Sequence, residues 1–184
     1  MRSPTRSLKT YSGAFESIRL AFTPDPPLPQ TELSRTSANY PTELAKLHVY
    51  LDSVDATELL PSAYMLWLLG DLLRGLAELV TDQTTTVVAQ WWSDPWRFDL
   101  RGDLVRNRVY ITLQVPGRWV AMQDVNVPLD GFGKEVIRVG QEWRAYLDSI
   151  FHQELTHPEL SGQIRRYDDW LERAQEAFGR YKTD

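Results

Sequence analysis

Two of the three histidines lie beside a glutamate, in the segment that runs from His152 through Glu154 to His157. A zinc-peptidase helix needs two imidazoles four residues apart, with the glutamate directly after the first. Here the spacing is five residues, which turns the two rings about 140° apart on a helix, and Pro158 follows at once. We therefore interpret these side chains as helix-end and loop residues, and we predict no metal site.

Other catalytic signatures are incomplete in this chain. It has no cysteine, which excludes disulfides, thiolate nucleophiles and the cysteine ligands that a zinc deaminase would place after His152 and Glu154. No Gly-x-Ser-x-Gly nucleophile elbow occurs. The segment from Gly131 to Lys134 lacks the length of a phosphate-binding loop and the Ser or Thr that follows it. We assign no catalytic residue and no cofactor.

The first group of residues that remains is aromatic, in the run WWSDPW that begins at Trp91. On a strand, alternation places Trp91 and Trp92 on opposite faces. Trp92 would then share a face with Tyr110, Val120 and Met122, and such a patch is typical of a partner-binding surface. The alternative is that the N-terminal segment or a helix of the same chain covers this patch.

The second group is basic and follows one predicted hairpin. Alternation places Arg97, Arg101 and Arg108 on its polar face, where guanidinium groups can bind carboxylates or phosphates. Asp99 lies between them and weakens the case for phosphate. The alternative is a solvated edge whose charges prevent strand addition. The predicted partner-binding residues are Trp92, Arg97, Arg101, Arg108 and Tyr110.

A four-stranded antiparallel meander between Thr84 and Leu129 positions both groups, because the hydrophobic period there is two and three turn signals divide it. The turns are expected at 93–95, 102–103 and 116–117. The side chains expected to face the core are Val87, Ala89 and Trp91, then Trp96, Phe98 and Leu100, then Val109, Ile111, Leu113 and Val115, then Trp119, Ala121, Val125 and Val127.

Three helices are expected to pack on this sheet. An apolar stripe after Pro61 predicts the first, which is expected to lie on the sheet. Stripes that repeat at three and four residues from Phe132 to Ile150 and from Leu160 to Tyr181 predict a C-terminal antiparallel hairpin. The predicted fold class is therefore α+β, with an antiparallel meander of four to six strands against one long helix and that hairpin.

The N-terminal quarter is less regular. Residues 15–22 and 46–52 alternate like strands, and both can pair with the meander. Five prolines between Pro24 and Pro41 exclude a helix or a central strand and favour an extended arm. We therefore divide the chain into residues 1–45, a strand plus proline-rich arm, and residues 46–184, a single α+β domain.

Charge and hydropathy restrict the location and the partners. The basic N-terminus has no apolar run after it, so we expect no secretory signal and a cytoplasmic location. The most apolar stretch, 63–80, contains Asp71, Arg74 and Glu78, so we expect a buried helix and no membrane partner. A net charge of -5 and a pI near 5.3 disfavour nucleic acid as a partner of the isolated chain.

This order of elements from Leu47 to Tyr181, with its tryptophan-rich meander and acidic pI, resembles small bacterial immunity-type proteins and the uncharacterised families around them. The resemblance implies a non-enzymatic protein that binds and blocks a protein partner, such as a toxin, through the outer sheet face. One alternative is a small-molecule binder or enzyme with a pocket between sheet and hairpin, using His152, Glu154 or Asp124. A second is a subunit of a nucleoprotein assembly that uses the arginines.

Overall fold

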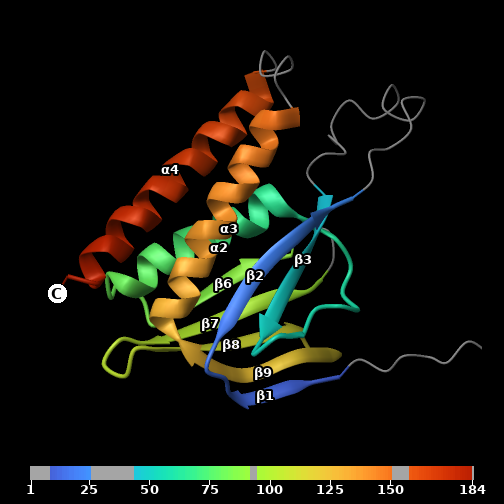
Figure 1. Cartoon of the computed structure of the whole chain (residues 1–184), viewed down its shortest axis with the longest axis vertical. Helices are drawn as coiled ribbons and strands as arrows, with labels where there is room; N and C mark the ends of the chain where they lie inside the picture. The colour runs from blue at the N-terminus through green and yellow to red at the C-terminus, as the bar shows by residue number, and fades with distance from the viewer. Residues whose placement is uncertain (1–8, 26–43, 92–94, 151–157, 184) are drawn as a thin grey trace, which may run out of the picture.

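The computed structural model describes residues 9–25, 44–91, 95–150 and 158–183, which form two β-sheets and three helices (Figure 1). The predicted α+β class is confirmed, as are the predominantly antiparallel pairing and the C-terminal pair of helices. None of the helices within these ranges is both long and apolar enough to cross a bilayer.

The larger sheet contains the predicted meander. Its strands, in the spatial order β1-β9-β8-β7-β6, are β1 (Tyr11–Ala14), β9 (Trp119–Pro128), β8 (Arg108–Val115), β7 (Arg97–Asp103) and β6 (Thr86–Gln90). The four consecutive strands pair antiparallel, as their alternation predicts. Strand β1, which the sequence analysis missed, adds to β9 in parallel. Four residues are too few for the alternation to identify a strand.

The smaller sheet is separate from the meander. It consists of β2 (Ile18–Pro24), β3 (Leu44–Leu51), β4 (Val54–Asp55) and β5 (Ala63–Tyr64). The sequence analysis left open whether β2 and β3 join the meander, and in the structure they pair with each other from Ile18↔Leu51 to Pro24↔Ala45. Alternation fixes which side chains face inward and leaves the neighbouring strand undetermined.

Part of the predicted division at residue 45 lies outside the described residues. Residues 1–8 and 26–43 are not described, and the second of these ranges carries most of the prolines of the predicted arm. The two described strands before the boundary, β1 and β2, both pair with strands after it. The boundary itself stays a prediction.

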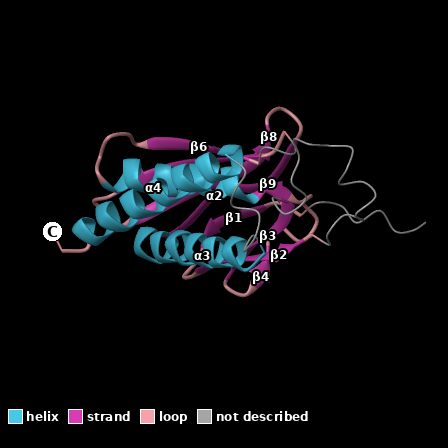
Figure 2. Cartoon of the chain, turned by 90° about the horizontal axis from the view of Figure 1, so that it is seen from above, coloured by secondary structure: helices cyan, strands magenta, loops and turns pink. Residues whose placement is uncertain are grey.

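The helices are α2 (Met65–Val80), α3 (Leu129–Ile150) and α4 (Pro158–Tyr181). Helix α2 lies between the larger sheet and α4, and two glycines allow the close approach. A Cβ on Gly75 would lie 2.4 Å from Val87, and one on Gly70 would lie 2.2 Å from Trp170. Helix α3 packs on β2, and Figure 2 shows it beside the smaller sheet, with α2 and α4 side by side. The Tyr167 hydroxyl of α4 donates to the Gly140 carbonyl of α3 at 2.9 Å.

An irregularity in β9 changes which side chains face the core. The register between β8 and β9 shifts around Leu113, and Asp124 takes a positive φ of 47°. As a result Ala121 and Met122 are both buried, and Trp119 is 55% exposed. The predictions that Trp119 faces inward and that Met122 faces outward are therefore wrong, because a bulge inserts an extra residue and breaks strict alternation.

Candidate protein-binding face

The face of the larger sheet opposite the helices carries the predicted arginines. We call it the open face and define it by the outward side chains of β7 and β8. These are Arg97, Asp99, Arg101, Asp103, Arg108, Tyr110, Thr112 and Gln114. They are half-buried or exposed, whereas the residues that alternate with them on β8 and in the first half of β7 are buried under the helices. Four of the five predicted contact residues are thus brought to one surface.

Arg101 and Tyr110 form the centre of the open face. They lie directly opposite each other in the β7–β8 register. The guanidinium carbon of Arg101 lies 4.0 Å from the centroid of the Tyr110 ring. Stacking of this kind orients a guanidinium while its N–H donors stay available at the rim.

The other two arginines differ in their ion pairing. Arg97 Nε lies 3.1 Å from Asp99 Oδ1, and Gln114 Nε2 donates to Asp99 Oδ2 at 2.6 Å. Arg108 lies opposite Pro128 in the register, and its buried Nη1 has no hydrogen-bond partner within the described ranges. Asp103 lies opposite Arg108 in the β7–β8 register but pairs with Arg106 at 3.8 Å, and among the described residues no carboxylate forms an ion pair with Arg101 or Arg108.

The predicted aromatic patch is only partly realised. Trp91 faces the core, fully buried, and its indole N–H donates to the Pro61 carbonyl at 3.1 Å. Trp92 lies outside the described residues, so its position stays a prediction. Met122 is buried by the bulge. The sequence analysis did not select Val88, which is 40% exposed and pairs with Asp99 in the register. The alternation of β6, which places Val87 inward, is the signal that could have found it.

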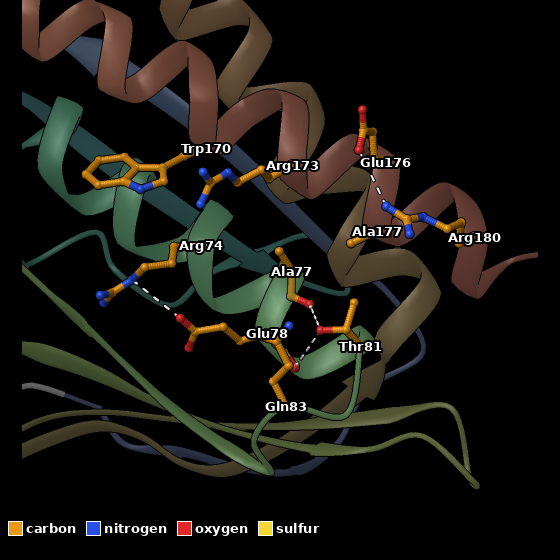
Figure 3. Close-up of a pocket in the computed structure, with 10 residues that line it drawn as sticks. All are labelled: Arg74, Ala77, Glu78, Thr81, Gln83, Trp170, Arg173, Glu176, Ala177 and Arg180. Carbon is orange, nitrogen blue, oxygen red and sulfur yellow. Dashed lines mark hydrogen bonds and ion pairs between the residues drawn. The ribbon is translucent and has the colours of Figure 1, made fainter.

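The predicted alternative, a pocket between the sheet and the hairpin, gains no support. His152 and Glu154 lie outside the described residues. A hollow of about 290 Å³ does occur, between α2 and α4, and Figure 3 shows the side chains around it. Asp124 does not line it. Two of its arginines have carboxylates nearby, with 4.0 Å between Arg74 and Glu78 and 3.4 Å between Arg180 and Glu176.

A second group of polar side chains lies on the smaller sheet. His48 Nδ1 is 2.7 Å from Asp55 Oδ2, and His48 Nε2 is 3.1 Å from Thr23 Oγ1. We call these three residues the relay. Sequence reasoning placed His48 outward and did not link it to the others, because a pairing across residues 26–43 creates the contact. Within the described ranges, no three His, Asp or Glu side chains are grouped so as to hold a metal ion.

Comparison with known proteins adds no relative. No protein-family model matches the chain, and no curated protein or solved structure is similar to it. The resemblance to immunity-type proteins therefore stays a prediction, and function has to be argued from the two groups of side chains.

Proposed function

We propose that this chain is a protein-binding module whose open face binds an acidic segment of a partner protein. The observation that carries the proposal is Arg101, stacked on Tyr110 beside Arg108, with no carboxylate of the described chain paired to either arginine. A partner that supplies a carboxylate would neutralise the Arg101 charge through bidentate hydrogen bonds.

The residue types of the open face, and the fixed position of Arg101, favour protein binding. Arginine and tyrosine are enriched among the residues that contribute most to interface affinity. Arg101 is already held by the Tyr110 ring, so binding costs less side-chain entropy than for a free arginine. Exposed Val88 supplies an apolar contact at the margin of the same face. Blocking a partner, as immunity-type proteins do, would need a surface of this kind.

The absence of cysteine allows a sharp test. Val88→Cys in the full chain introduces a unique thiol beside the open face, which can carry a photo-crosslinker. Glu172→Cys places the same label on the exposed surface of α4 as a matched position. In a lysate of the source organism, we expect a protein partner to be captured through residue 88 and not through residue 172.

Variants of the labelled chain then test the residues. Arg101→Ala together with Tyr110→Ala should weaken capture by about 30-fold or more, the effect of losing about 2 kcal/mol at an interface. Arg166→Ala, an exposed arginine of α4, should leave capture unchanged. Equal capture by the double variant, or nucleic acid in place of protein on the crosslinker, would contradict the proposal.

A further inference from the structure

The relay joins a hydroxyl, an imidazole and a carboxylate on three strands of the smaller sheet. Thr23 is on β2, His48 on β3 and Asp55 at the end of β4. The side chains of His48 and Asp55 are 17% and 16% exposed, and Thr23 is exposed at the surface. The hydroxyl end of the relay is therefore open to a small molecule, and the carboxylate end is shielded.

A buried threonine holds the carboxylate end in place. The backbone N–H of Thr57 donates to Asp55 Oδ1 at 2.9 Å. Thr57 is fully buried, and its own Oγ1 accepts a hydrogen bond from the Val49 N–H at 2.9 Å. Asp55 is thus tied to the core of the sheet, and it orients the imidazole from that fixed position.

The ionisation of Asp55 determines the direction of the hydrogen bonds. Burial raises the pKa of Asp55, but hydrogen bonds from His48 and Thr57 outweigh burial and hold the pKa below its usual value. An ionised carboxylate only accepts, so His48 donates to Asp55 from Nδ1. An imidazole whose single proton is on Nδ1 accepts the hydroxyl proton of Thr23 at Nε2. This arrangement of nucleophile, base and orienting acid is shared by serine hydrolases of unrelated folds.

We propose that Thr23 is the nucleophile of an acyl-transfer site that accepts activated carboxylic esters, with His48 as general base and Asp55 as the positioning residue. Thr23 Oγ bonds to the carbonyl carbon, and its proton moves to His48 Nε2. The bond from that carbon to the leaving oxygen then breaks, and His48 returns the proton to the leaving oxygen. Water next attacks the acyl-threonine carbonyl, its proton passes through His48 to Thr23 Oγ, and the carboxylic acid leaves.

An adjacent hollow contains a cationic side chain, to which we assign the far end of the substrate. It has a volume of about 230 Å³ and is lined by Ser17, Arg19, Tyr50 and Ser53. Tyr50 stacks against His48 with ring centroids 6.1 Å apart, so the hollow begins beside the relay. The Arg19 guanidinium lies over the Tyr50 ring at 4.4 Å. Arg19 and Thr23 are four residues apart on one face of β2, a span of about 13 Å. A long ester with an anionic far end fits this distance.

The test uses the full chain and p-nitrophenyl acetate, whose leaving group departs readily. We expect release of p-nitrophenolate and a transient acetyl group on Thr23, located by peptide mass spectrometry. Thr23→Ala should remove the acetyl group from this peptide, and Thr23→Ser should retain it. His48→Gln and Asp55→Asn should each slow the acetylation by about 100-fold or more. Thr85→Ala, at an exposed threonine outside both groups of side chains, is the matched control and should change nothing.

The anionic end is tested with the p-nitrophenyl monoester of sebacic acid, a long dicarboxylic acid. Arg19→Gln should raise KM for this ester and leave KM for p-nitrophenyl acetate unchanged. Circular dichroism and thermal unfolding of each variant separate lost chemistry from lost fold. Acetylation that misses Thr23, or that proceeds equally in a folded His48→Gln variant, would overturn the proposal. Either result would leave the proposal for the open face intact, because that proposal rests on the other sheet.

Discussion

The outward faces of the two sheets use their polar residues in opposite ways. On the smaller sheet, hydrogen bonds connect Thr23 to His48 and His48 to Asp55. Asp55 in turn accepts a hydrogen bond from the buried Thr57. On the larger sheet, Arg101 and Arg108 have no carboxylate partner in the described chain. The first arrangement supports the proposed acyl-transfer site, and the second supports the proposed binding of an acidic segment. Both faces arise from the same alternation of side chains.

The supports of the two sheets differ as well. The larger sheet is covered by α2, whereas the smaller one depends on α3. Phe22 of β2 meets Trp143 of α3 edge to face, with ring centroids 5.1 Å apart. Two side chains of α3 also hold the backbone of β2, because Glu135 accepts the Leu20 N–H at 2.9 Å and Arg138 donates to the Leu20 carbonyl. We therefore expect the smaller sheet to unfold before the larger sheet when its contacts with α3 are weakened.

The largest effect is expected from Trp143→Ala. Trp143 is fully buried against Phe22, and removal of a buried indole typically costs about 3–5 kcal/mol of unfolding free energy. Trp143→Phe, which keeps an aromatic ring against Phe22, should cost much less. Hydrogen exchange should show lost protection in β2 and β3 before β7 and β8. Equal loss in both sheets would mean that they unfold as one unit.

A smaller and pH-dependent effect is expected from Glu135→Ala. A hydrogen bond from a backbone N–H to a charged carboxylate contributes about 1.5–3 kcal/mol. Burial raises the pKa of Glu135, but Arg138 and the Leu20 N–H outweigh it and lower the pKa overall. The stabilisation is thus present above the unfolded-state pKa of the carboxyl and is lost as pH falls through its folded-state pKa.

Urea unfolding at neutral and at acidic pH checks this prediction. The difference between wild type and Glu135→Ala should shrink in acid. Glu142 is the matched control, since it also pairs with Arg138 at 2.6 Å but its side chain is 51% exposed. Glu142→Ala should cost no more than about 1 kcal/mol at either pH. A Glu135 effect that does not change with pH would show that packing, rather than the charge, holds β2.

The smallest effect on stability is expected on the open face. Arg101→Ala removes a stacking contact with Tyr110 that is worth about 0.5–1 kcal/mol at an exposed site. A double-mutant cycle with Tyr110→Ala, followed by urea unfolding, measures the coupling. A coupling well above that range would make the pair part of the fold and would weaken its assignment to partner binding.

The sequence predicted the meander and the helices because their hydrophobic periods are long and regular. Residues Val109, Ile111, Leu113 and Val115 alternate without a break, and all four are buried. The bulge was not predictable, since nothing in the alternation of β9 marks Asp124 as the residue with positive φ. The relay was also missed. Thr23 and His48 are 25 residues apart, and only the pairing of β2 with β3 brings them together.

The hydrogen bonds between two α3 side chains and the backbone of β2 also affect how the protein behaves at high concentration. An unpaired strand edge is a template on which further chains can align and aggregate. At Leu20 that template is blocked, because Glu135 and Arg138 occupy both hydrogen-bonding groups that an incoming strand would need. Two side chains of one helix thus make the backbone hydrogen bonds that a neighbouring strand would otherwise make. Unlike a strand, they present no free edge on which another chain can pair.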